Sequence, residues 1–115
     1  MANTFKVVTK AGVTSADVIY TVAGSTTTVV LGLIIGNTTS SSINATVTLG
    51  TDTGNRSGAN DEANQAVELI TTTPIPGNST LELLAGNKVV METTDTLSVT
   101  GSGAVDVVLS IMELT

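Results

Sequence analysis

The last long run of the chain, Ala104–Leu114, is rich in apolar residues. Branched aliphatic residues recur there at every second position: Val105, Val107, Leu109 and Ile111. Asp106 and Ser110 lie between them. Because successive side chains of an extended chain point to opposite faces, this pattern predicts a β-strand with one face in a core. The other face would meet water or a partner.

Shorter runs rich in Val, Leu, Ile and Thr precede it, separated by Gly, Pro, Asn and Asp residues. The runs are Thr4–Thr9, Asp17–Val22, Thr26–Asn37, Ile43–Leu49, Ala66–Ile70, Leu81–Leu84, Lys88–Met91 and Leu97–Val99. Nowhere do apolar residues recur at helical spacing with capping residues. We therefore predict an all-β fold: an antiparallel β-sandwich or jelly-roll-like domain of about eight or nine short strands, with almost no helix. A short helical turn is predicted only at Asn60–Gln65.

The length of 115 residues suits a single domain. We predict one β-sandwich over residues 1–115, with a short N-terminal arm over residues 1–12. Lys6 and Lys10 make this end basic in an acidic chain. Two interpretations stay open: an edge strand whose lysines deter pairing with other edges, or an arm that pairs with a neighbouring subunit or an acidic host surface.

The run Thr26–Asn37 is apolar on both of its predicted faces. An uninterrupted period of two puts Val30, Gly32 and Ile34 together on the second face. Glycine there would allow another backbone to approach closely. We predict a self-interface at these three residues, with burial of the strand inside one sandwich as the alternative.

Composition argues against several functional classes. The chain has no histidine and no cysteine, which removes the commonest general base and metal ligand and every thiolate site, so we expect no enzyme activity, cofactor or metal. The net charge is −6, and charged residues make up 12% of the chain against about 25% in typical domains. We expect no nucleic-acid partner, because phosphates need clustered cations and stacking needs aromatic rings. We also expect no membrane partner: there is no long apolar segment, and the beginning lacks the apolar region of a signal peptide.

A few residues invite a chemical interpretation. The oxygen-rich loop Asp52–Glu62 is either a calcium site or a solvated loop, and its spacing does not match an EF-hand. Glu92 and Asp95 resemble a carboxylate pair, but we expect both to flank a solvated turn. Ser79 and Lys88 form no recognisable dyad motif. A glycan site would need an aromatic platform, and Phe5 and Tyr20 are the only aromatic residues.

Taken together, several blocks resemble small structural proteins from the virions of tailed phages, particularly marine and cyanobacterial ones. The blocks are MANTFK at the start, VIYTVAGSTTTVVLGLIIGN at Val18–Asn37, PIPGNST at Pro74–Thr80, LELLAGNKVVME at Leu81–Glu92, and Asp95-Thr96-Leu97 followed by VVLSIMEL at Val107–Leu114. The order of these blocks carries the resemblance, which covers most of the chain outside Gly50–Gln65. It implies a non-enzymatic β-domain on the particle.

On this basis we predict a capsid decoration (cement) protein, a homotrimer that bridges major capsid proteins on the capsid exterior of the virion. It would be synthesised in the cytoplasm of the bacterial host. Predicted capsid contacts come from the basic end and the long loop: Asn3, Phe5, Lys6, Lys10, Asp52, Arg56 and Asp61. A tail, neck or fibre-associated virion module is the alternative, and a glycan-binding β-sandwich is the second alternative.

Overall fold

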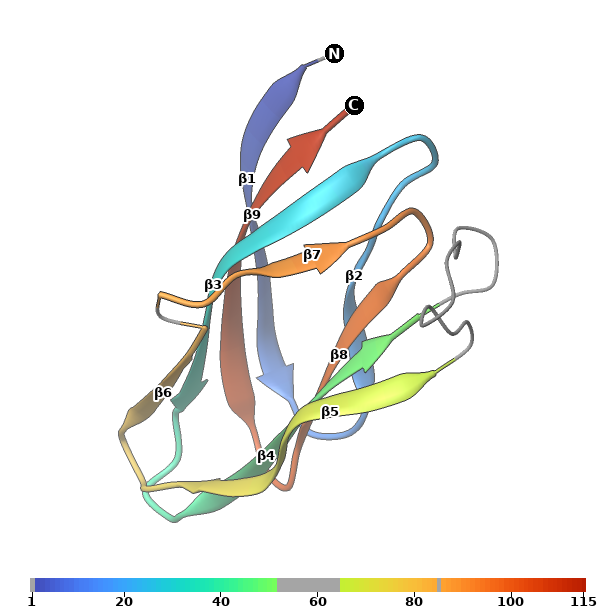
Figure 1. Cartoon of the computed structure of the whole chain (residues 1–115). Coiled ribbons are helices and arrows are strands. Elements are labelled where there is room, and N and C mark those ends of the chain that lie inside the picture. Colours follow the sequence, from blue (N-terminus) through green and yellow to red (C-terminus); the bar gives the residue numbers. More distant parts are fainter. Residues whose placement is uncertain (1, 52–64, 85) are drawn as a thin grey trace.

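A computed structural model describes residues 2–51, 65–84 and 86–115. In these residues it contains nine β-strands in two antiparallel sheets (Figure 1). The first sheet contains β1 (Asn3–Val13), β9 (Val105–Leu114), β3 (Thr27–Asn37), β6 (Thr80–Leu83) and β7 (Val89–Met91). The second sheet contains β2 (Asp17–Thr21), β8 (Thr96–Gly101), β4 (Ile43–Gly50) and β5 (Ala66–Ile75). No described residue is helical, so the prediction of an all-β sandwich is confirmed.

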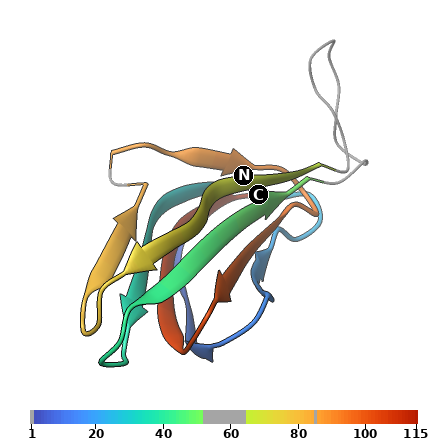
Figure 2. The ribbon, with the colours of Figure 1, turned by 90° about the horizontal axis from the view of Figure 1, so that it is seen from below.

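The strand order is that of a jelly roll. The first sheet is ordered β1-β9-β3-β6, with β7 also paired to β3, and the second is ordered β2-β8-β4-β5. β6 and β7 pair with different parts of β3 and therefore fill one position in the sheet. Counted as one interrupted strand, they leave eight strands in two four-stranded layers. The chain passes from one layer to the other at every connection except that between β4 and β5, which is the jelly-roll arrangement. Figure 2 shows the two layers from below.

The core lies between the two sheets and consists of the alternating apolar residues that the sequence predicts. β9 contributes its branched aliphatic face, Val105, Val107, Leu109 and Ile111, each at most 1% exposed. Leu97 and Val99 of β8 and Ala45 and Val47 of β4 meet them from the second sheet. Burial of these side chains stabilises the domain by about 1.5–3 kcal/mol for each large one.

The segment predicted as an arm forms the edge strand of the first sheet. β1 stays in continuous register with β9 from Asn3 opposite Leu114 to Lys10 opposite Val107 (Figure 1). It runs on to Val13 through an irregularity at Gly12, where φ is +68° and the backbone N–H donates to Asp106 at 2.9 Å. The interpretation as an edge strand is therefore the one that the structure supports.

β5 also extends further than its sequence pattern suggests. Pro74 lies beyond the predicted run Ala66–Ile70, yet it pairs with Asn44 of β4 inside the strand. β5 is an edge strand, and a proline is tolerated there because its missing N–H can face away from the ladder.

A bulge in β3 changes which of its residues face the core. Val30 lies opposite Ile111 and Gly32 lies opposite Ser110, so Leu31 is an extra residue between two consecutive pairs. The extra residue shifts the alternation by one step. Val30 is 0% exposed and Leu33 1%, although an unbroken period of two would place them on opposite faces. The prediction that Val30 shares an outward face with Gly32 and Ile34 is therefore wrong.

Buried Asn37 organises the end of the sandwich where β3 stops. Its side-chain amide donates to the carbonyls of Ser41 at 2.7 Å and Ile75 at 2.9 Å, and its Oδ1 accepts the backbone N–H of Thr39 at 2.9 Å. The backbone at Gly77 lies so close to the turn at Ser40 that a Cβ at position 77 would be 2.4 Å from the carbonyl oxygen of Ser40. These contacts are structural. A search of the described residues finds no helix of the length and apolarity needed to cross a membrane.

Candidate functional site

The outer face of the first sheet is unusually apolar. Seven large apolar side chains are exposed among the described residues. Five of them project from this face: Phe5, Val7, Ile34, Val90 and Val108. Contiguous exposed apolar surface of this kind typically marks a contact with another macromolecule.

The strand register arranges these side chains in rows across the sheet. One row runs through all four strand positions and contains only large apolar residues: Phe5, Met112, Val29 and Val90. We call it the ridge row. The next row along the strands contains Val7, Ser110 and Gly32, and we call it the trough row. A Cβ at Gly32 would have no atom of a non-neighbouring residue within 4 Å. The surface of the sheet is therefore lower at Gly32 than at the ridge row.

The strand register places two acidic side chains on this face, both on the same side of the trough row. Glu82 lies opposite Ile34 and Asp106 opposite Gly36, both beyond the trough row. The ridge and trough rows themselves contain no ionisable side chain. An apolar surface without charge loses little solvation free energy on contact with another apolar surface.

The outer face of the second sheet has the same geometry and different chemistry. Its middle strands present hydroxyl side chains in two paired rows, Thr46 opposite Thr100 and Thr48 opposite Ser98, and Thr96 opposite Gly50 follows them. All are partly buried by their neighbours. The Thr46 hydroxyl also accepts the backbone N–H of Thr72 at 2.9 Å, at a bulge in β5. This face stays hydrogen-bonding and uncharged at its centre.

The predicted capsid contacts on β1 divide into two groups. Asn3 and Phe5 are exposed on the outer face of the sheet, and Phe5 is 72% exposed. Lys6 and Lys10 lie on the opposite side of the strand, where Lys6 pairs with Glu113 at 2.8 Å and Lys10 with Asp17 at 3.5 Å. The remaining predicted contacts, Asp52, Arg56 and Asp61, lie outside the described residues, as do the predicted calcium loop and nearly all of the predicted helical turn.

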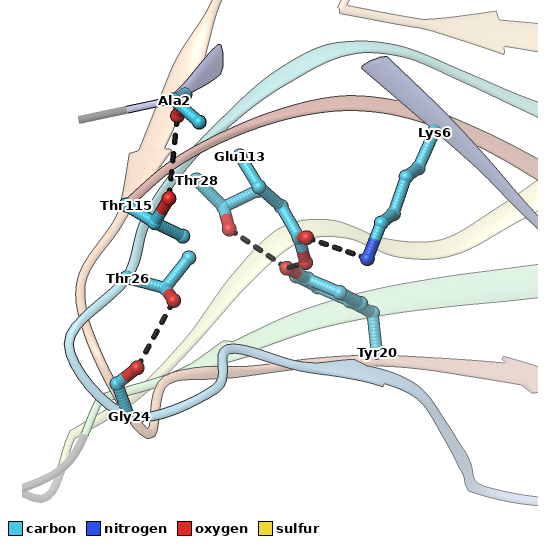
Figure 3. Close-up of polar contacts among 8 residues, drawn as sticks. All are labelled: Ala2, Lys6, Tyr20, Gly24, Thr26, Thr28, Glu113 and Thr115. Carbon is cyan, nitrogen blue, oxygen red and sulfur yellow. Dashed lines mark hydrogen bonds and ion pairs between the residues drawn. The ribbon is translucent and has the colours of Figure 1, made fainter. Parts of the chain in front are cut away.

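A polar cluster links the two sheets at the end of the sandwich where the termini lie. Tyr20 of β2 donates its hydroxyl to Glu113 Oε2 at 2.5 Å and lies 2.7 Å from the hydroxyl of Thr28 on β3. Lys6 of β1 completes the cluster through the other carboxylate oxygen of Glu113 (Figure 3). Four strands from both sheets therefore meet at one carboxylate.

The surroundings shift the pKa values of Tyr20 and Glu113 in opposite directions, and both shifts favour a protonated phenol that donates to an ionised carboxylate. Burial, followed by the hydrogen bond to Glu113, raises the pKa of Tyr20 to about 12. The hydrogen bond from Lys6, followed by that from Tyr20, lowers the pKa of Glu113. A phenol with a raised pKa is a poor proton donor at neutral pH, so this cluster is suited to holding the sheets together and not to acid–base chemistry.

The other residues considered for chemistry have structural roles. Asp95 is 2% exposed, and its Oδ2 accepts the backbone N–H of Glu92 at 3.0 Å, which caps a turn. Ser79 donates to the carbonyl of Gly77 at 3.4 Å within the turn before β6. Over the part of the chain that the structure describes, no pocket is found and no group of three or more acidic side chains is placed to hold a metal ion.

No protein-family model and no curated protein matches the chain. The chain is similar to a protein of the solved Bacillus endospore appendages, which are described as a novel family of disulfide-linked pili. The two are 14% identical, the match covers 99% of this chain and 87% of that chain, and the TM-score is 0.48. This chain has no cysteine, and the identity is too low to assign a function.

Sequence reasoning missed the apolar face because its members come from distant parts of the chain. Phe5, Val29, Val90 and Met112 become neighbours only through the pairing of β1, β9, β3 and β7. One local signal was available: Gly32 in the middle of an apolar run is typical of a bulge.

Proposed function

We propose that this protein is a structural module that functions by being built into an assembly and performs no reaction of its own. The observation that carries the proposal is the apolar outer face of the first sheet, with five of the seven exposed large apolar side chains. A face of this chemistry favours contact with protein surface over contact with water. Ala2 and Thr115 exchange backbone hydrogen bonds of 3.1 and 3.0 Å, so β1 is held to β9 along nearly its whole length, which suits a structural role.

The specific role that we propose is decoration of a tailed-phage capsid, and it is supported by the resemblance of the sequence blocks. In this role the open edge of β1 is the proposed contact with the major capsid protein. An edge strand offers a row of unpaired backbone groups to which a partner can add a strand. Asn3 and Phe5 are exposed beside this edge. The predicted homotrimer remains a prediction.

The alternative role is a module of the tail or neck of the same kind of particle. Quantitative mass spectrometry of purified particles separates the two, with the major capsid protein as internal standard. Hundreds of copies of this chain per particle would support decoration of the head, and a dozen or fewer would support the tail. Absence of the chain from purified particles would reject both roles.

The contact through β1 needs a test that leaves the sheet intact. Deletion of residues 2–10 would remove the strand that covers the edge of β9, so loss of particle binding would have two explanations. Phe5→Ser and Asn3→Pro change the exposed edge at its end, where proline removes one backbone donor. We expect reduced occupancy on particles, with Thr100→Ser on the other sheet as the control. Unchanged occupancy for both variants would reject β1 as the contact.

A further inference from the structure

We propose that the outer face of the first sheet binds the same face of a second copy of this chain, with the ridge row of each copy in the trough row of the other. This inference concerns the isolated protein and does not rest on the proposed function. It is argued from the shape, charge and area of the face.

The shape of the face is complementary to itself. A two-fold axis in the plane of the interface, parallel to the rows and midway between them, exchanges the two rows of facing copies. Met112 of one copy then lies over Ser110 of the other, and Val29 lies over Gly32. Large side chains therefore meet small ones on the two central strands, β9 and β3, and the apolar side chains of Phe5 and Val7 meet at the β1 edge. The patch is in this way complementary to itself, as a closed two-fold interface requires.

The charge distribution favours a second copy over a charged partner. The chain has a net charge of −6, so two copies repel one another over most orientations. The ridge and trough rows contain no carboxylate, and the acidic residues of this face, Glu82 and Asp106, lie beyond them. A basic partner would be drawn to the acidic remainder of the surface and not to these rows.

The area suits a weak, concentration-dependent pair. Four strands about 4.8 Å apart make the face about 19 Å wide, and four overlapping rows at two residues per row make the overlap about 27 Å long. The four rows are the ridge and trough rows and one on each side, so Glu82 lies at the margin of the overlap, on the edge strand β6 opposite Ile34. The plan area is about 500 Å² per copy, or about 1,000 Å² in total, which lies at the lower limit for a specific interface. We therefore expect a pair that dissociates on dilution in the micromolar range.

A trimer would need different surfaces. A face that meets its own copy closes with two chains, whereas three chains require two dissimilar patches on each. The mass of the complex therefore separates this inference from the predicted homotrimer.

The first test fills the trough without adding charge. Gly32→Leu adds an apolar side chain where space is open. Nonspecific apolar association would become stronger, whereas packing of the ridge row into the trough row would be blocked. Sedimentation equilibrium should show a monomer–dimer equilibrium for the unchanged chain and dissociation at least about tenfold stronger for Gly32→Leu, which corresponds to about 1.4 kcal/mol. Thr100→Leu adds the same side chain to the outer face of the other sheet and should leave the equilibrium unchanged.

The second test does not depend on the folding of the Gly32 variant. The chain has no cysteine, so Ser110→Cys places one thiol in the trough row, and Ser98→Cys places one on the other sheet as a matched control. A short thiol-to-thiol crosslinker should join two chains through Cys at position 110 and not at position 98. A monomer at all concentrations, a three-chain mass, tighter association of Gly32→Leu, or equal crosslinking at both positions would overturn the inference.

Discussion

The outer faces of the two sheets are built on the same backbone plan and present opposite surfaces. In the central strands β8 and β9, one from each sheet, every second residue is buried over most of the strand and the residues between them point outward. In the first sheet the outward residues are largely Val, Met, Phe and Ile; in the second they are largely Thr and Ser. The comparison shows that the alternation of residues determines the core. The residue types at the outward positions determine whether a face is stable in water or favours contact with a partner.

The largest expected effect is on stability, and it tests which residues of β3 face the core and which face outward. Val30→Ala removes two methyl groups from a side chain that is 0% exposed, and should lower the free energy of unfolding by about 2 kcal/mol. Val90→Ala on the outer face, where the side chain is 59% exposed, should change it by less than about 0.5 kcal/mol. Urea unfolding of both variants measures the difference. Equal effects would mean that the bulge does not shift the alternation.

The next prediction erases the contrast between the faces. Replacing Thr48, Ser98 and Thr100 together with valine gives the second sheet an apolar outer face like that of the first. A chain with two such faces can bind a copy on each side, so growth no longer closes at two chains. Sedimentation velocity should then show species larger than a pair. The same triple change in a Gly32→Leu background should give smaller species, and no change in size would contradict the prediction.

A third prediction concerns the cluster that joins the sheets carrying the two faces. Because the pKa of Tyr20 rises from 10.0 to about 12 on folding, the unfolded chain loses this proton first as the pH increases. The stability that protonated Tyr20 contributes is therefore present below pH 10 and is lost as the pH rises toward about 12. Tyr20→Phe should remove most of this alkaline loss, measured by urea unfolding on either side of pH 10.

The same group offers a direct measurement. Tyr20 is the only tyrosine, so the tyrosinate absorbance of the folded chain reports it alone. The midpoint should lie near 12 in the folded chain and near 10 in denaturant. A midpoint near 10 in both would show that the Tyr20 hydroxyl is neither buried nor hydrogen-bonded to Glu113.

The smallest expected effect is on the exposed ion pair between β1 and β2. Lys10 and Asp17 lie 3.5 Å apart, with side chains that are 52% and 38% exposed. Solvent and salt screen such a pair, so Lys10→Gln should change the free energy of unfolding by no more than about 0.5 kcal/mol. Thermal unfolding at low and high salt would check this. A loss well above that size would mean that the edge strand depends on this lysine.

Most of the fold was predictable, because the strands and their core faces follow from the alternation of neighbouring residues. All nine strands fall on the predicted apolar runs, and the core faces of β4, β8 and β9 contain the predicted residues. The ends of β1 and β5 were missed, since Gly12 and Pro74 usually interrupt strands and here lie at the edges of their sheets. The alternation of β3 was predicted one step out of phase because apolar residues occupy both of its sides, so only Gly32 signals the extra residue.

The candidate site was much less predictable. Of the three predicted self-contact residues, Gly32 and Ile34 lie on the outer face of the first sheet, and Val30 lies in the core. The polar cluster could not be anticipated, since Tyr20 and Glu113 are 93 positions apart in the chain.

The sequence by itself determined that this chain forms short strands, how many there are, and which side of most of them enters the core, because a period of two is a property of neighbouring residues. Only the tertiary structure decided that Phe5, Val29, Val90 and Met112 form one surface, and that the side chains of β3 change sides at Leu31. The physical reason is that strand pairing joins residues far apart in the chain, and a single extra residue in a ladder reverses every side chain beyond it.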